Sequence, residues 1–193
     1  MNSPAVLLLS SLLLASGAAA LRAADDFKPE AGFVSLFNGR DLSGWCYAGS
    51  EVFDGKTESV DGRYSAYEGV IVVHPKKEDG PRIQQLWTLK TFPKNFELRL
   101  EFRAEVNADS GIFLRKPQLQ CRDYLVAGPY KELKQYKPQE WNEIVVVVKD
   151  GIAHCTCNGE VLEAALKLPE TGPIGLEADR GQMEYRRIRI KEE

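Results

Sequence analysis

The chain has 193 residues, of which 44% are hydrophobic and 27% are charged, and its formal net charge at pH 7 is −3. A chain of this length predicts one domain that buries roughly 70% of the surface of its unfolded state. The charges are mixed in sign, and no run of Lys or Arg is interleaved with aromatic residues. This composition argues against a nucleic-acid partner.

The first 24 residues have the layout of a secretory signal peptide. A largely apolar run from Ala5 to Leu14 precedes a stretch of small residues that extends to Ala20. The apolar run is too short to span a bilayer, and no later stretch is long enough to do so. We therefore expect cleavage after Ala20 or Ala23, a single mature domain over residues 25–193 without a membrane span, and export to the periplasm or the extracellular space.

Short strands are predicted through the first half of the chain. Ala31–Phe37 is the first, and it is followed by a turn-rich loop that ends at Trp45. Residues 47–65 are polar and rich in Gly, which is typical of a long surface loop, and such loops often border a binding site. Residues 66–73 and 83–89 predict two further strands.

The clearest signal is the alternation from Phe96 to Arg103, in which every second residue is apolar and every other one is charged. A period of two predicts a strand with one buried face and one solvated face. The outward charges alternate in sign, as expected for cross-strand ion pairs. These residues need no functional explanation.

A polar row is predicted on a strand in the middle of the chain. Alternation places Gln118, Gln120 and Arg122 on one face, opposite Leu119, Cys121 and Asp123. Amides and a guanidinium offer donors and acceptors that suit hydroxyl groups, although a solvated outer face explains them equally well. Asp123 is either a turn residue at the strand end, the interpretation that its spacing favours, or a sheltered carboxylate.

The second half of the chain predicts a meander. Asp150-Gly151 and Asn158-Gly159 are strong signals for tight hairpins, so three strands follow one another. Residues 161–168 predict a helical turn or a bent strand, 172–178 a strand, and 183–191 a last strand with a bulge near Arg186 and Arg187. About ten short strands with frequent Gly and Asn turns predict an all-β, antiparallel β-sandwich.

The four cysteines allow three disulfide pairings, among which the sequence does not choose. Cys155 and Cys157 lie two apart on a predicted strand with parallel side chains, a poor geometry for a bond between them. We favour small, buried, reduced cysteines, since their spacing does not match a zinc site. The complete list of cysteines is Cys46, Cys121, Cys155 and Cys157.

The two histidines, His74 and His154, are far apart and offer no ligand spacing, so the sequence identifies no metal site and no cofactor. His154 would share a face with Ile152 and Thr156, which is typical of a surface residue.

The order of several phrases resembles the 3-keto-disaccharide hydrolase domain family over nearly all the mature chain. The phrases are Phe33–Trp45, Phe96–Phe102, Asp109–Arg115, Glu140–Asn142, Asn158-Gly159, and Gly172–Leu176 with Tyr185–Ile188. The resemblance implies a concanavalin-like jelly roll, usually exported, with an oxidised glycoside as its carbohydrate substrate. Relatives act on glycosides that carry a ketone at C3.

The chemistry that the resemblance implies needs a base but no Ser or Cys nucleophile. A C3 ketone acidifies the proton on C2, so that a carboxylate can remove it to form an enolate, which expels the substituent on C1. Such a site also needs an acid for the leaving oxygen and a group facing the enolate oxygen.

Carried over by position, the family's glutamate, glutamine and aspartate fall on Gln118, Gln120 and Asp123. Gln118 cannot take a proton. Many relatives carry a glutamine and a histidine where this chain has Glu177 and Asp179. We therefore expect the acid and base among Asp123, Glu177 and Asp179, which in the last two cases could equally be solvent-facing residues at a strand end.

Two functional hypotheses follow. The first is an exported hydrolase or lyase of 3-keto-glycosides, with Arg115 or Arg122 facing the enolate. The second is a non-catalytic carbohydrate-binding module on the same sandwich. In the first hypothesis, the residues that bind the sugar ring are Gln118, Gln120, Arg122, Trp45 and Tyr130. A third class, an adhesion domain, is disfavoured because the strands are charged rather than apolar along their exposed faces.

Overall fold

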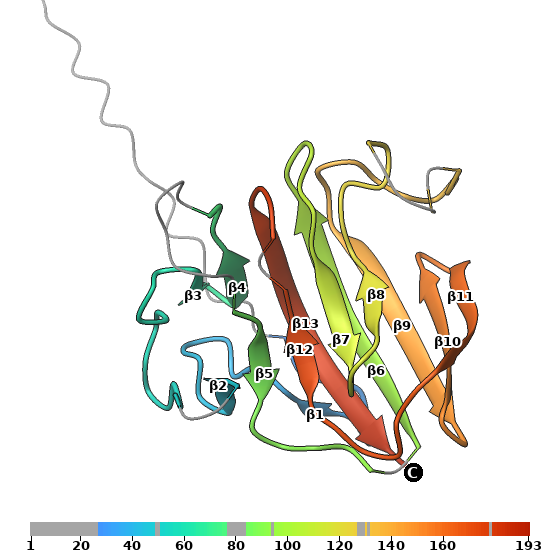
Figure 1. Ribbon diagram of the computed structural model, residues 1–193, viewed down its shortest axis with the longest axis horizontal. Coiled ribbons are helices and arrows are strands. Elements are labelled where there is room, and N and C mark those ends of the chain that lie inside the picture. Colours follow the sequence, from blue (N-terminus) through green and yellow to red (C-terminus); the bar gives the residue numbers. More distant parts are fainter. Residues whose placement is uncertain are drawn as a thin grey trace, which may run out of the picture.

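The computed structural model describes residues 27–48, 51–76, 84–93, 95–126, 130, 132–177 and 179–193. Within these residues the chain forms 13 β-strands in two antiparallel sheets (Figure 1). The all-β, antiparallel sandwich predicted from the sequence is confirmed. The predicted signal peptide at residues 1–24 lies outside the described residues. Among the residues described, no helix has the length and apolar character needed to cross a membrane.

The larger sheet has eight strands in the order β11-β10-β9-β6-β13-β4-β3, with β1 paired to β13. Its strands are β1 (Val34–Ser35), β3 (Tyr64–Tyr67), β4 (Val70–Val73), β6 (Phe96–Ala104), β9 (Asn142–Lys149), β10 (Ile152–Cys157), β11 (Glu160–Lys167) and β13 (Met183–Glu192). The predicted alternation in β6 and the predicted meander β9-β10-β11 are both confirmed. The bulge predicted near Arg187 is also present, because the register of β13 against β6 shifts between Arg186 and Arg189.

The smaller sheet has five strands in the order β2-β5-β12-β7-β8 and lies in front of the larger one in Figure 1. Its strands are β2 (Trp45–Tyr47), β5 (Leu86–Thr88), β7 (Gly111–Leu114), β8 (Gln118–Gln120) and β12 (Ile174–Leu176). Long stretches of chain separate β2, β5, β7 and β12, so this sheet joins distant parts of the sequence.

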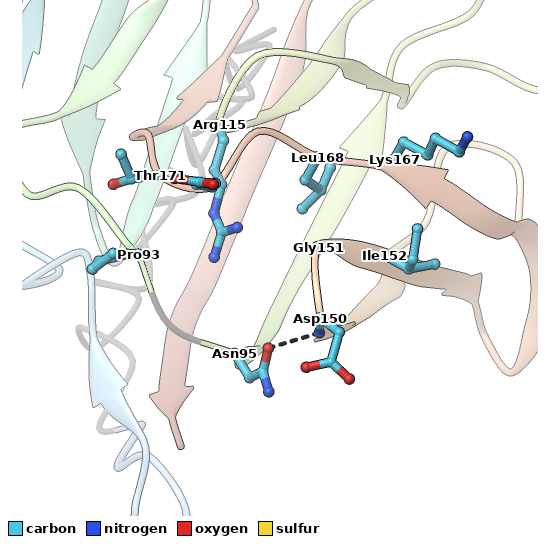
Figure 2. Close-up of a pocket in the computed structure, with 10 residues that line it drawn as sticks. Pro93, Asn95, Arg115, Asp150, Gly151, Ile152, Lys167, Leu168 and Thr171 are labelled. Atoms are coloured by element: carbon cyan, nitrogen blue, oxygen red, sulfur yellow. Dashed lines mark hydrogen bonds between the residues drawn. The ribbon is translucent and has the colours of Figure 1, made fainter.

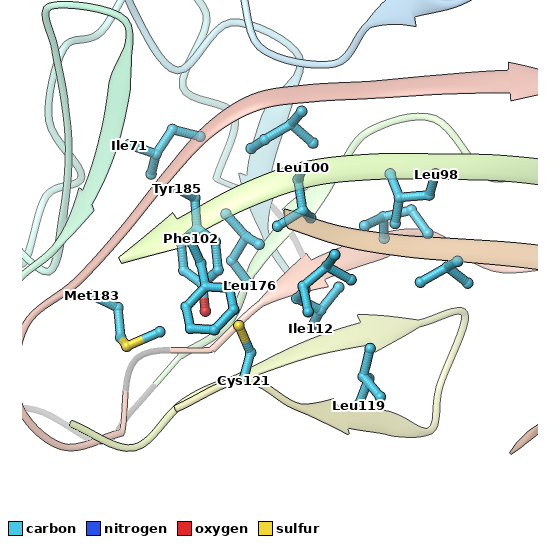
Figure 3. Close-up of a cluster of buried hydrophobic side chains, with 14 of the residues drawn as sticks. Ile71, Leu98, Leu100, Phe102, Ile112, Leu119, Cys121, Leu176, Met183 and Tyr185 are labelled. Carbon is cyan, nitrogen blue, oxygen red and sulfur yellow. The ribbon is translucent and has the colours of Figure 1, made fainter. Parts of the chain in front are cut away.

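The core lies between the inner faces of the two sheets. Figure 3 shows Phe102 and Tyr185 of the larger sheet facing Ile112, Leu119 and Leu176 of the smaller one. All of these side chains are fully buried. Apolar area removed from water is worth roughly 25 cal/mol per Å², so this contact is what holds the two layers together.

One sequence prediction about strands was wrong in detail, and one alternative that the sequence left open is decided by the structure. Residues 66–73 form parts of two strands rather than one, because Glu68 and Gly69 both adopt a positive φ and turn the chain between β3 and β4. For residues 161–168 the sequence allowed a helical turn or a bent strand, and the strand is confirmed, because Glu160–Lys167 pairs with β10 as β11, with shifts in register near Cys155. Pairing with β10 makes this segment a strand. That pairing cannot be predicted from the sequence of the segment itself.

All four cysteines are free thiols, as the favoured interpretation predicted. Cys121, Cys155 and Cys157 are fully buried, and Cys46 is half-buried. His154 lies exposed on β10, as predicted for a surface residue.

The segment before β1 is attached to the larger sheet by a two-pronged ion pair. The Arg189 guanidinium, which is 4% exposed, donates to the two Glu30 carboxylate oxygens at 2.7 and 2.9 Å. The hydrogen bond from Arg189 is the largest of the causes that lower the pKa of Glu30 from 4.5 to about 2.

This pair should make stability depend on acid pH. A carboxyl whose pKa is lowered in the folded state stabilises it above the unfolded value, and that contribution is lost as the pH falls from 4.5 towards 2. Because Glu30 is half exposed, we expect less than about 1 kcal/mol. The melting temperatures of wild type and Glu30→Gln should differ at pH 6 and converge towards pH 2. A constant difference across that range would contradict the linkage.

Candidate functional site

The outer face of the five-stranded sheet carries aromatic and polar side chains in cross-strand register. We define this face by the row of residues that pairs across all five strands, namely Cys46, Trp87, Gly175, Phe113 and Gln118. Trp87 and Phe113 are half-buried, and their ring centroids lie 5.2 Å apart. Gly175 lies between them, and a Cβ there would come within 2.6 Å of the Trp87 ring. A glycine is therefore needed for the two aromatic side chains to meet.

The next row contains Glu177, Gly111 and Gln120. The Glu177 amide donates to the Gly111 carbonyl at 2.9 Å, and Gly111 pairs with Gln120. Because Gly111 has no side chain, Gln118 reaches diagonally over it, and its Nε2 donates to Glu177 Oε2. A Cβ on Gly111 would lie 2.2 Å from that Nε2 atom. Gln118 and Gln120 thus lie beside Glu177 on one face.

Buried hydroxyl groups hold the backbone of Glu177 from the inside of the sandwich. Ser110 Oγ donates to the Glu177 carbonyl at 2.7 Å, so the bond between Ser110 and the Tyr185 hydroxyl, at 2.9 Å, has Tyr185 as its donor. The Tyr64 hydroxyl lies 2.9 Å from both the Leu176 and the Gln84 carbonyl oxygens and shares its one proton between them. Both tyrosines belong to the eight-stranded sheet, so each sheet takes part in placing the Glu177 carboxyl.

The pKa of Glu177 is raised above its ordinary value of 4.5. Desolvation by burial is the largest cause, and the negative charge of Asp179 is the second. The hydrogen bond from Gln118 acts in the opposite direction, and the charge of Asp109 raises the pKa further. Glu177 is therefore a more basic carboxylate than an exposed glutamate. Perturbed carboxyls of this kind are typical of sites that transfer protons.

Arg122 fixes the second amide of the polar row. Its Nη1 donates to Gln120 Oε1 at 2.8 Å, and its Nη2 donates to Asp109 Oδ2 at 2.7 Å. With its oxygen occupied, Gln120 presents its NH₂ group as the donor available to a ligand. Gln118 is arranged the other way, because its NH₂ group serves Glu177 and its oxygen remains an acceptor. The face thus offers one donor and one acceptor beside a basic carboxylate.

Asp123 occupies a different place. Its carboxylate is 3% exposed and accepts from the Asn107 amide at 3.1 Å, the Tyr136 hydroxyl at 3.4 Å and the Leu125 amide at 3.4 Å. The sequence allowed two interpretations of Asp123, a turn residue or a sheltered carboxylate, and both apply. β8 ends at Gln120, so Asp123 lies beyond the strand, and the alternation does not continue to it: Arg122, predicted to face outward with Gln120, is also buried.

The structure also separates other predicted site residues from Glu177. Trp45 is fully buried in the core, where its Nε1 donates to the Leu36 carbonyl at 2.9 Å. Tyr130 packs edge-on against Tyr124, and its hydroxyl donates to Glu163 on β11 at 2.6 Å.

Arg115 directly follows the last residue of β7, whereas the Glu177 amide bonds to Gly111, the first residue of that strand. Arg115 and Glu177 therefore lie at opposite ends of β7. Asp179, by contrast, is exposed two residues beyond Glu177 and influences its pKa.

Sequence reasoning missed three residues of this site, which are Trp87, Phe113 and Asp109. Trp87 points outward between the buried Leu86 and Thr88, but the sequence alone did not indicate this, because Trp87 and Leu89 form an alternate set as apolar as Leu86 and Thr88. Phe113 likewise points outward between the buried Ile112 and Leu114, within an apolar run that carries no alternation in the sequence. Nothing in the local sequence around Asp109 indicated its contact with Arg122, which is a product of the fold.

No group of three or more His, Cys, Asp or Glu side chains able to hold a metal ion occurs in the part of the chain that the structure describes.

A model of the 3-keto-alpha-glucoside-1,2-lyase-like domain matches residues 32–191. Among solved structures, a "putative glycosyl hydrolase" from Parabacteroides distasonis ATCC 8503 shares 19% identity at a TM-score of 0.64, covering 84% of this chain and 94% of that one. A second such protein of the same organism shares 19% identity at a TM-score of 0.53 over 67% and 90%. A comparison with curated proteins gave no match.

The fold is also similar to a β-glucanase of Bacillus licheniformis. The two share 10% identity at a TM-score of 0.50, over 83% of this chain and 97% of the glucanase. This similarity concerns the fold alone and agrees with the predicted concanavalin-like jelly roll.

Gly111→Ala tests the contact between Gln118 and Glu177. The new Cβ should push the Gln118 amide away, and because that hydrogen bond lowers the pKa of Glu177, the pKa should rise further. The matched control is Gly175→Ala, which displaces Trp87 instead. Carboxyl ¹³C NMR titrations of both folded variants provide the measurement. An unchanged Glu177 midpoint in Gly111→Ala would show that the contact does not set this pKa.

Proposed function

The chain belongs to the 3-keto-alpha-glucoside-1,2-lyase-like family, and from this premise we propose that it cleaves 3-keto-glycosides on the outer face of the five-stranded sheet. The family is carbohydrate-active and implies a carbohydrate substrate. The observation that carries the proposal is the half-buried Glu177 carboxyl, whose pKa is raised beside Gln118. Such a carboxylate is suited to removing a proton next to a ketone.

In the proposed reaction, Glu177 takes the proton from C2, and the electron pair of that C–H bond forms the enolate with the C3 carbonyl. The enolate then re-forms the ketone, a C1–C2 double bond is made, and the C1–O bond breaks. The departing oxygen takes a proton from solvent at this surface. Addition of water to the resulting enone gives the hydrolysis product.

Gln120 is proposed to stabilise the enolate. Its NH₂ group is free to donate because Arg122 occupies its oxygen, and the guanidinium behind the amide strengthens the amide dipole. Trp87 and Phe113 provide an apolar surface on which a sugar ring can stack. The leader-like layout of residues 1–24 supports the further proposal that the protein acts after export.

A non-catalytic carbohydrate-binding module is the second candidate. The observation that favours it is Gln118, which stands where the resemblance places a glutamate and which cannot accept a proton. The two candidates differ in their need for Glu177. A binding module uses the aromatic and amide groups and loses nothing when this carboxyl is neutralised.

Incubation with 3-keto-trehalose, 3-keto-sucrose and 3-keto-β-glucosides, with measurement of released sugar, tests the reaction. We expect release by the wild type and a loss of about 100-fold or more in kcat for Glu177→Gln, with substrate affinity retained. Release at wild-type rates by Glu177→Gln would contradict its role as base. No release by wild type, together with affinity for an unoxidised glycan, would favour the binding module.

Asp179→Asn tests the electrostatic part of the proposal. A base must be deprotonated, so kcat/KM should fall as the pH drops through the pKa of Glu177. Removing the charge of Asp179 removes one cause that raises this pKa, so the acid limb should move to lower pH. Asp150→Asn, an exposed carboxylate at the other end of the sandwich, is the matched control. An acid limb that stays in place in Asp179→Asn would contradict the assignment.

A further inference from the structure

A pocket of about 680 Å³ opens at the end of the sandwich away from Glu177, within the range of roughly 300–1,000 Å³ typical of small-molecule sites. It forms where the β7–β8 turn, the β9–β10 hairpin and the connection from β11 to β12 meet (Figure 2). Arg115 lines it and extends its guanidinium between Pro93 and Gly151. Its side chain therefore reaches a space that the proposed reaction does not use.

Arg115 is rigidly held. Its amide donates to the Pro173 carbonyl at 2.9 Å, and its Nη1 donates to the Pro169 carbonyl at 2.8 Å. Its guanidinium lies 5.4 Å from the centre of the Phe96 ring. Its φ is +65°, a left-handed conformation that a non-glycine residue keeps only where the surroundings impose it. Holding a cation in this way pre-organises it for a ligand.

The charged side chains that line the pocket are two cations and two carboxylates, so their net charge is zero. Arg115 is only 7% exposed, whereas Lys167, Asp150 and Glu170 lie exposed around it. The buried Arg115 is screened by water less than the three exposed charges, so it is the charge that a ligand inside the pocket meets most strongly. A guanidinium stays charged at any working pH, and a hydrogen bond that it donates to a carboxylate is charge-assisted.

The remaining lining suits a sugar. Asn95 and Thr171 carry an amide and a hydroxyl that can bond to ligand hydroxyls. Leu168, half-buried, and Ile152, 37% exposed, provide apolar surface for the C–H faces of a ring. Figure 2 shows these side chains around the same space as Arg115.

We propose that this end pocket is a second carbohydrate site, which binds a short saccharide bearing a carboxylate, that is, a uronic acid, through Arg115. The proposal rests on the carbohydrate-active family and on the pocket, and not on the role of Glu177. Failure of the reaction proposed for Glu177 would therefore leave it standing.

Calorimetric titration with cellobiouronic acid, cellobiose and inorganic phosphate tests the proposal, since the first two ligands differ only in the carboxylate. The wild type should bind the uronate at least about tenfold more tightly than either of the others, because cellobiose lacks the charge-assisted hydrogen bond to Arg115 and phosphate lacks the sugar ring. Arg115→Gln should lose this preference.

Thr171→Trp provides a second variant that does not alter a buried residue, because its exposed side chain would fill the pocket and should weaken uronate binding about tenfold or more. Thr57→Trp, at an exposed threonine that does not line the pocket, is the matched control and should bind the uronate like the wild type. The proposal is overturned if cellobiose or phosphate binds as tightly, if no ligand binds, or if folded Thr171→Trp keeps full affinity.

Discussion

The position of Glu177 depends on hydroxyl groups that cross the core. Tyr185 of the eight-stranded sheet donates to Ser110, which donates to the Glu177 carbonyl. The Tyr64 hydroxyl of the same sheet shares its proton between the Leu176 carbonyl at the end of β12 and the Gln84 carbonyl. A hydroxyl buried without a partner is costly, so these bonds fix both the spacing of the layers and the course of the chain. The carboxyl of Glu177 emerges on the opposite side of that strand, held half-buried, and burial is the main cause of its raised pKa.

Two glycines allow side chains on the outer face of the five-stranded sheet to approach one another. Gly175 lets Trp87 and Phe113 meet, and Gly111 lets Gln118 reach Glu177. The outer face of the five-stranded sheet therefore combines an apolar surface for a ring with a basic carboxylate and oriented amides. This combination suits the elimination chemistry proposed for a member of the 3-keto-alpha-glucoside-1,2-lyase-like family.

Much of the fold followed from period-two patterns and hairpin signals, as in β6 and the meander β9-β10-β11. The shared face of Gln118 and Gln120 followed from the same rule. Where no strand is predicted, the sequence does not tell which side of a sheet a residue faces. Trp45 is such a residue: it is predicted to bind the sugar, but it lies in the core. The neighbours of Asp109 depend on pairing between distant strands, which local sequence does not contain.

The three tryptophans offer the most direct test of where the carbohydrate binds. Trp45 lies in the core, Trp87 on the outer face of the five-stranded sheet, and Trp141 against Arg103 and Arg186 of the eight-stranded sheet. Their indole N–H resonances can be followed by ¹⁵N NMR while a 3-keto-disaccharide is added to Glu177→Gln protein. We predict that the Trp87 resonance shifts and saturates while the other two stay in place. A shift confined to Trp141, or none at all, would contradict the account.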